Sequence, residues 1–177
     1  LKYSKPNGDF VLDIQGGGSD LIFPHHEMSA SQVRIITDQE FARAYVHAGL
    51  IGLDGEKMSK SKGNLLFVSK MVASGIDPMV IRWALLKRHY RNDYMWLGNE
   101  IDAAKSEIEI LKLAINNEKC PPTEPVIKEI YASLADDLDT PRALRALNGW
   151  ANEQGSGGDS KALCNVIDAL LGIALPS

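Results

Sequence analysis

The hydrophobic pattern of the second half of the chain is helical. One stripe of apolar residues, spaced three and four positions apart, predicts a long helix, and its members are Ile101, Ala104, Ile108, Leu111 and Ile115. Such a stripe needs partner helices, which are predicted over 123–138, from Thr140-Pro141 to about 152, and after a cap at Asp159. The inward-facing residues expected on the first and last of these are Ile127, Ile130, Leu134 and Leu138, and Leu163, Val166, Ile167 and Leu170. We therefore predict an all-α bundle over residues 98–177.

The first half of the chain has the pattern of an α/β layer. Residues 10–15 predict a short buried strand that breaks into a tight turn at the glycines 16–18. A helix is expected from about Pro24 to Ile36, followed by a second strand over 44–53. This order of strand, helix and strand favours a parallel sheet. Asp77-Pro78 then predicts the start of a further helix.

The composition is that of a globular chain with a core of its own. Its 177 residues are 45% hydrophobic, and no run of eighteen apolar residues or signal peptide is present, so a cytoplasmic protein is expected. The two cysteines, Cys120 and Cys164, are too few for a disulfide framework, and structural roles are favoured for both. The tryptophans are expected in the core. Because the chain opens on Leu1 in what looks like a turn before a strand, we expect it to be a fragment.

Charge divides the chain into two parts. Residues 1–97 carry 12 basic and 10 acidic side chains, whereas residues 98–177 carry 7 and 13, a net charge of −6. An acidic second half repels polyphosphates, so binding of nucleic acid there is disfavoured.

Two loops of the first half carry candidate chemistry. Lys57 and Lys60 lie in a loop between glycines, where their ammonium groups could close over phosphate oxygens that gain charge in a transition state. The alternative is a solvated basic loop. In the other loop, Gly18, Ser19 and Asp20 could bring backbone amides and a carboxylate to a nucleotide, or could form only a turn.

Several motifs together resemble the class I aminoacyl-tRNA synthetases. KMSKS at 57–61 matches the signature of that superfamily, and DIQGGGSDLIFPHHE at 13–27 is similar to the segment of cysteinyl-tRNA synthetases that carries zinc and the adenylate. DPMVIRWALL, His89-Tyr90-Arg91 and DDLDTPRAL follow in the expected order, so the resemblance covers nearly the whole chain. The HIGH signature that begins this catalytic fold is absent from the sequence, which implies that an upstream half is missing.

The resemblance implies roles for individual residues. It places the adenylate at Gly18, Ser19 and Asp20, adenine recognition at the backbone of Ile51, and phosphate contacts at Lys57 and Lys60. It makes His25 a zinc ligand beside two cysteines that lie outside this sequence. Cysteine-specific synthetases place a glutamate four residues after that histidine, but here the position is Ser29, a poor zinc ligand, so a substrate thiolate could take the fourth position. His26 and Glu27 stay ambiguous between supporting, packing and helix-start roles.

Three features favour a paralogue of the synthetases. Ser29, Gln15 where synthetases have histidine, and the spelling AYVHAGLIGLDG look like the cysteine ligases of mycothiol biosynthesis. Membership of that family implies L-cysteine, ATP and glucosaminyl inositol as substrates, Zn²⁺ and Mg²⁺ as metals, and neither tRNA nor membrane as a partner. The alternatives are a cysteinyl-tRNA synthetase and a non-catalytic helical interaction module.

The expected architecture is α/β followed by all-α. Residues 1–66 would form the C-terminal part of a Rossmann-like nucleotide-binding catalytic domain with the KMSKS loop, 67–97 a connecting helical segment, and 98–177 the helical bundle.

Overall fold

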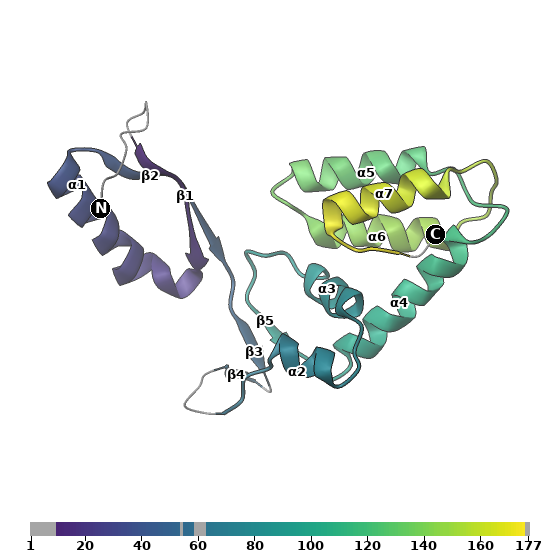
Figure 1. The fold of residues 1–177 in the computed structure, drawn as a ribbon, viewed down its shortest axis with the longest axis horizontal. Coiled ribbons are helices and arrows are strands. Elements are labelled where there is room, and N and C mark those ends of the chain that lie inside the picture. The colour runs from purple at the N-terminus through teal and green to yellow at the C-terminus, as the bar shows by residue number, and fades with distance from the viewer. Residues whose placement is uncertain (1–9, 54, 59–62, 176–177) are drawn as a thin grey trace. The chain divides into compact units, whose positions relative to one another are not determined.

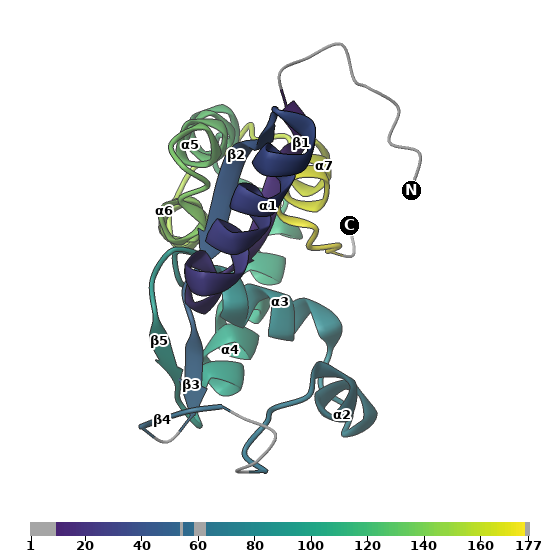
Figure 2. The same ribbon diagram turned by 90° about the vertical axis from the view of Figure 1, so that its left-hand side faces the viewer.

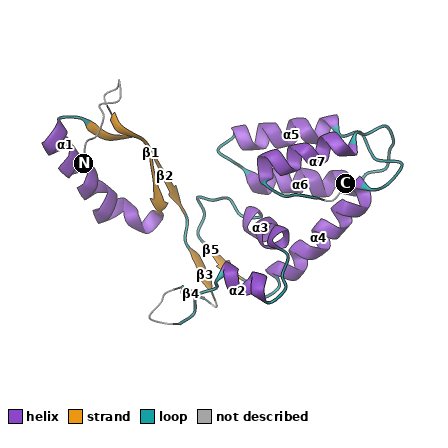
Figure 3. Cartoon of the chain, in the orientation of Figure 1, coloured by secondary structure: helices purple, strands orange, loops and turns teal. Residues whose placement is uncertain are grey.

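The chain packs into two compact units. The computed structural model describes residues 10–53, 55–58 and 63–175. One unit consists of the described residues up to Gly52 together with Arg91–Tyr94, and the other of those in Leu53–Tyr90 and from Met95 onward. Each unit combines segments that lie far apart in the sequence, so this division does not test the expected domain boundaries at residues 66 and 97. Those boundaries stay predictions. Most helices belong to the second unit (Figure 3).

The first unit is a pair of parallel strands with a helix on one face. Strand β1 (Phe10–Gly18) pairs in parallel with β2 (Glu40–Ala48), and their carboxyl ends are level because Gly18 lies opposite Ala48. Helix α1 (Glu27–Thr37) connects them and lies along the pair (Figure 2). The predicted strand, helix and parallel strand are therefore confirmed.

Strand β1 is longer and more exposed than its sequence predicts. The glycine run is not a turn, because all three glycines pair with β2. The prediction of a buried strand was also wrong, because Leu12 is 37% and Ile14 64% exposed. Gln15 contacts His26 on the side of α1, so by alternation Leu12 and Ile14 point to the opposite face of the two-stranded sheet.

The start of α1 also differs from the prediction. The chain after β1 forms a 3₁₀ turn (Ser19–Leu21) and an irregular turn (Ile22–His26) before the regular helix begins at Glu27, three residues later than expected. The cause is Phe23, whose extended backbone (φ −135°, ψ 136°) interrupts helical geometry. Glu27 lies in the first turn, where its charge is favourable.

The predicted second strand is divided in two. β2 ends at Ala48 and β3 (Ile51–Leu53) begins after Gly49 and Leu50. The Leu50 amide donates to Asp93 Oδ1 at 2.6 Å, and the Leu50 carbonyl accepts from the Tyr94 amide at 3.0 Å. A Cβ on Gly49 would lie 2.3 Å from the backbone of Asn92, so only glycine allows this close approach. β3 is the centre of a second sheet in the order β4 (Glu56–Lys57), β3, β5 (Tyr94–Trp96).

The second unit is predominantly helical. After α2 (Val68–Ala73) and α3 (Pro78–Leu86), the long α4 (Glu100–Ile115) leads to α5, α6 and α7, which group together (Figure 1). These last three span Glu124–Ala135, Thr140–Ala151 and Ser160–Leu171. The predicted bundle is confirmed, as are the caps at Asp77, which accepts from the Met79 amide, and at Asp159, which accepts from the Ala162 amide. The expected cap at Thr140-Pro141 was wrong, because Asp139 caps α6 by accepting from the Arg142 amide and Thr140 is already helical. None of the helices in the described ranges is long and apolar enough to cross a lipid bilayer.

The bundle core contains most of the residues that the helical spacing selects. Ala104, Ile108, Leu111 and Ile115 are buried, as are all three tryptophans. Two predicted core positions were wrong, because Leu138 is 55% exposed and Leu171 replaces Leu170 on the buried face of α7. Leu138 lies beyond the end of α5 with a positive φ of 56°, so the helical spacing no longer applies to it. Cys120 and Cys164 are buried free thiols whose pKa burial raises, which agrees with structural roles.

Two motifs of the resemblance contact each other in this unit. His89 Nε2 donates to the carbonyl of Asp137 at 3.0 Å, and the Tyr90 hydroxyl donates to Asp137 Oδ1 at 2.8 Å. Asp137 and Leu138 both have positive φ values, which cost energy in residues other than glycine. The His89-Tyr90 pair therefore holds the strained turn between α5 and α6.

A carboxylate at Glu107 joins three helices of the second unit. It accepts from Trp83 Nε1 on α3 at 2.7 Å, from the ammonium of Lys87 just after α3 at 2.6 Å, and from Asn148 Nδ2 on α6 at 3.2 Å. Burial raises the pKa of Glu107, but these hydrogen bonds together outweigh it and hold the pKa below the ordinary value of 4.5.

We expect Glu107→Gln to lower the free energy of unfolding at neutral pH by about 1–3 kcal/mol. Because the folded-state pKa lies below the unfolded one, this contribution is complete above pH 4.5 and is lost as the pH falls through the lowered pKa. Urea titration of both proteins, followed by the fluorescence of tryptophans that all lie in this unit, measures the difference. An equal difference at neutral and strongly acidic pH would contradict the assignment.

Candidate functional site

Side chains from β1, the turn before α1 and β2 meet at the carboxyl ends of the strands. Gln15 Nε2 lies 3.0 Å from His26 Nε2, and His26 Nδ1 lies 2.8 Å from His47 Nε2. The amide nitrogen of Gln15 is only a donor, so His26 accepts at Nε2, carries its proton at Nδ1 and donates to His47. The two rings lie with centroids 5.0 Å apart, and His26 is buried. This chain of hydrogen bonds fixes the orientation of His26, one residue after His25.

The glycine run makes room for this arrangement. A Cβ on Gly17 would lie 2.8 Å from Cε1 of His26, so the missing side chain is what admits the imidazole. A Cβ on Gly18 would lie 2.6 Å from Asp20 Oδ1 and 3.6 Å from Leu50, the neighbour of Ile51. The structure thus brings Gly18 close to Asp20 and to Leu50, the residue before β3, all in the first unit.

The predicted metal ligand, His25, lies at the surface of the first unit. His25 is exposed, and Ser29, one helical turn later, donates its hydroxyl to the His25 carbonyl at 2.8 Å. Over the described ranges, no group of three or more histidine, cysteine or acidic side chains is placed to hold a metal ion. His25 therefore offers one donor for zinc, and zinc binding would need further ligands from outside these ranges.

Of the two phosphate-binding candidates, the structure describes Lys57, which belongs to the second unit. Lys57 is the last residue of β4, and Lys60 lies outside the described residues. Ile51, the expected adenine contact, is the first residue of β3 and is half-buried in the first unit.

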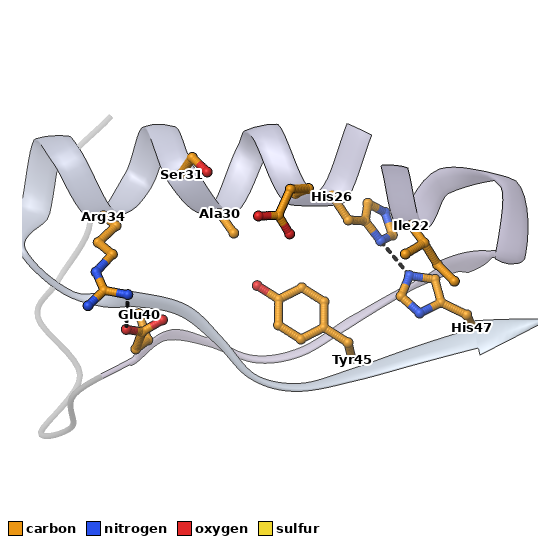
Figure 4. A pocket seen from close by; sticks show the side chains of 9 residues that line it. Ile22, His26, Ala30, Ser31, Arg34, Glu40, Tyr45 and His47 are labelled. Carbon is orange, nitrogen blue, oxygen red and sulfur yellow. Dashed lines mark hydrogen bonds and ion pairs between the residues drawn. The ribbon is translucent and has the colours of Figure 1, made fainter. Parts of the chain in front are cut away.

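A groove separates α1 from β2 within the first unit. Its volume is about 410 Å³, and its helix side includes Ala30 and Ser31. The His26–His47 pair closes one end, and the Arg34–Glu40 ion pair, at 3.0 Å, lies at the other (Figure 4). Between the two ends the ring of Tyr45 points toward the helix (Figure 4).

Sequence reasoning missed His47 and Tyr45 as site residues. Both point to α1, and their rings stack with centroids 6.5 Å apart. The available signal was their spacing of two in a predicted strand, which places them on one face. That signal does not reveal which face α1 covers, so the groove could not be predicted.

Comparisons with known proteins agree on one family. The model of the tRNA synthetases class I (C) catalytic domain matches residues 7–106. The structure of the Agrobacterium radiobacter K84 LeuRS in its ternary complex with tRNA and LeuAMS shares the fold, with a TM-score of 0.66 and 17% identity over 90% of this chain and 26% of that one.

Closer relatives are found among curated ligases. The chain is 50% identical to the L-cysteine:1D-myo-inositol 2-amino-2-deoxy-alpha-D-glucopyranoside ligase of Rhodococcus erythropolis, over 93% of this chain and 41% of that protein. The ligase of the same name from Actinosynnema mirum is 49% identical over 96% of this chain and 42% of its own length. The chain thus spans about two fifths of the length of these relatives. Since the family model covers more than half of the chain, the chain belongs to the class I tRNA synthetase (C) catalytic-domain family.

Proposed function

We propose that this chain is part of an ATP-dependent ligase that joins L-cysteine to the amine of glucosaminyl inositol in mycothiol biosynthesis. The observation that carries the proposal is the identity of about one half, over 93% of the chain, to ligases named for this reaction. By full-length protein we mean this chain together with the further segment that its relatives carry.

The reaction has two steps in this proposal. The carboxylate of cysteine attacks the α-phosphorus of ATP, and pyrophosphate leaves as cysteinyl adenylate forms. The free amine of the acceptor then attacks the carbonyl carbon, and AMP leaves as the amide forms. The first step builds charge on phosphate oxygens, which Mg²⁺ and the ammonium groups of Lys57 and Lys60 would stabilise.

The first unit supplies the binding groups. We assign the adenylate to the backbone and side chains of Gly18, Ser19 and Asp20, with the adenine near Ile51. A Cβ on Gly18 would lie 3.6 Å from Leu50, which directly precedes Ile51. This short distance between the two assigned segments supports a single nucleotide site there.

We assign His25 as one zinc ligand. A bound zinc ion would supply an electrophile that prefers the thiolate of cysteine to the hydroxyl of serine. The hydroxyl of Ser29 is directed to the His25 carbonyl, which supports the idea that it does not take the fourth position. The chain's own contribution is to orient this helix turn through the hydrogen bonds of His26 to Gln15 and His47.

Cysteinyl-tRNA synthetase is the second candidate, because the family model is named for tRNA synthetases. A tRNA acceptor requires cations for its phosphates, whereas residues 98–177 carry a net charge of −6. This negative charge favours glucosaminyl inositol, a small amino sugar, over tRNA as the acceptor of cysteine.

With ATP and cysteine, the full-length protein is expected to release AMP when glucosaminyl inositol is added, and to leave tRNA uncharged. AMP release and amide formation are measured by chromatography, and charging by transfer of labelled cysteine to tRNA. Efficient charging without amide would replace the ligase proposal with the synthetase. Absence of both reactions, and of cysteine-dependent pyrophosphate exchange, would favour a non-catalytic module.

A further inference from the structure

We infer that Asp93 is a positioning residue for the nucleotide, because it holds the backbone beside the proposed adenine contact, Ile51. This inference rests on the proposed function, from which the adenine assignment comes. It adds a residue that acts on the nucleotide through another residue, Leu50. The argument uses the place of Leu50 in the fold, its two hydrogen bonds and the geometry of the peptide that follows it.

Leu50 and Ile51 lie at the carboxyl end of the parallel strand pair. The strands β1 and β2 end level with each other, and Leu50 follows the last residue of β2, Ala48, by two positions. Ligands of open parallel sheets bind outside this edge. The assigned adenylate residue Gly18 lies here as well, since a Cβ on it would come within 3.6 Å of the Leu50 side chain. The peptide that links Leu50 to Ile51 therefore borders the assigned nucleotide site.

A segment distant in sequence binds both polar backbone groups of Leu50. The Asp93 carboxylate accepts from the Leu50 amide at 2.6 Å, and the Tyr94 amide donates to the Leu50 carbonyl at 3.0 Å. Gly49 permits this approach, because a Cβ there would lie 2.3 Å from the Asn92 backbone. Asp93 thus belongs to the first unit, although 43 positions separate it from Leu50. A carboxylate is a stronger acceptor than a neutral oxygen, so Asp93 holds the Leu50 amide firmly.

These two hydrogen bonds fix the direction of the Ile51 amide. The peptide bond between Leu50 and Ile51 is trans and planar, so its carbonyl oxygen and its N–H point in opposite directions. Because the carbonyl is bound to the Tyr94 amide, the Ile51 N–H is directed away from Tyr94. The hydrogen bond to Asp93 holds the peptide plane on the other side of Leu50. Together the two bonds set both backbone dihedral angles of Leu50.

A fixed N–H at Ile51 suits recognition of adenine. The N1 atom of adenine accepts a hydrogen bond, whereas N1 of hypoxanthine, the base of ITP, carries a proton and donates. A backbone N–H in a fixed direction distinguishes these bases, because the wrong base leaves the donor unpaired. An N–H that can turn distinguishes them less well. Asp93 thus contributes both to the affinity for ATP and to the choice of base.

Three variants of the full-length protein test this role. Asp93→Ala removes the acceptor, whereas Asp93→Asn keeps a side-chain oxygen that can accept from the Leu50 amide. Asn92→Ala is the local control, because the close contact with Gly49 involves backbone atoms of Asn92. Calorimetric titration without cysteine measures the Kd of ATP and of ITP.

We expect Asp93→Ala to raise the Kd of ATP on the order of tenfold and to lower the preference for ATP over ITP by a similar factor. In Asp93→Asn and Asn92→Ala both quantities should stay within about threefold of the parent. An unchanged Kd of ATP in Asp93→Ala would overturn the inference. So would equal weakening in Asp93→Ala and Asp93→Asn, because the second variant retains the acceptor.

Pyrophosphate exchange separates an effect on the nucleotide from loss of the fold. At saturating ATP, the KM for cysteine in Asp93→Ala should stay within about twofold of the parent, because Asp93 acts on the nucleotide side of the site. A rise in this KM as large as the rise in the Kd of ATP would overturn the positioning role. If the parent forms no amide but Asp93→Ala still weakens ATP binding selectively, the ligase proposal fails and the role of Asp93 stands.

Discussion

Lys60→Ala in the full-length protein is expected to slow the formation of cysteinyl adenylate on the order of a hundredfold or more. In the proposed reaction the Lys60 ammonium stabilises charge that develops on phosphate oxygens only in the transition state. Loss of such a contact lowers the rate much more than it weakens substrate binding. The KM for cysteine should therefore change little.

Pyrophosphate exchange at saturating ATP and cysteine measures this effect. Lys128→Ala is a matched control, because Lys128 is 75% exposed on α5 and pairs with Glu124 on its own helix. An exchange rate in Lys60→Ala equal to that of the control would remove Lys60 from the mechanism and favour the solvated-loop interpretation.

His25→Ala in the full-length protein is expected to lose nearly all bound zinc. With three protein ligands, removal of one leaves too few donors to retain the ion. The 177-residue chain alone is expected to bind zinc poorly, because its described residues contain no group of three or more histidine, cysteine or acidic side chains placed to hold a metal ion. Elemental analysis of the purified proteins measures metal content without any dependence on activity.

The controls separate loss of a ligand from loss of a histidine. His89→Gln changes a histidine of the second unit that contacts Asp137, and its zinc content should equal that of the parent. Ser29→Glu places a carboxylate one helical turn after His25, so it should raise the affinity for zinc and hinder entry of cysteine. Equal, tight zinc content in His25→Ala and the parent would refute the assignment.

The helical half of the fold was predictable because its signals are local. The spacing of Ala104, Ile108 and Leu111 identifies a buried stripe without knowledge of its partners. Asp77 and Asp159 act as caps by accepting from amides two and three residues further along the chain. The acceptor and the donor of each cap therefore lie in the same short segment of sequence. The prediction failed at Leu138, where the chain leaves the helix and a turn held by Tyr90, far away in sequence, takes over.

The sequence by itself determined the α/β order, the bundle, the caps at Asp77 and Asp159 and the family, because each depends on residue types at short spacing or on long runs of matching motif. Only the tertiary structure decided that Gly17 continues β1 and admits the ring of His26, that His26 bonds to Gln15 and His47, and that a groove lies between α1 and β2. These features join residues 11 to 21 positions apart, and their geometry depends on strand register and on which face the helix covers. Neither quantity is encoded in the pattern of a single segment, because both arise from packing between segments.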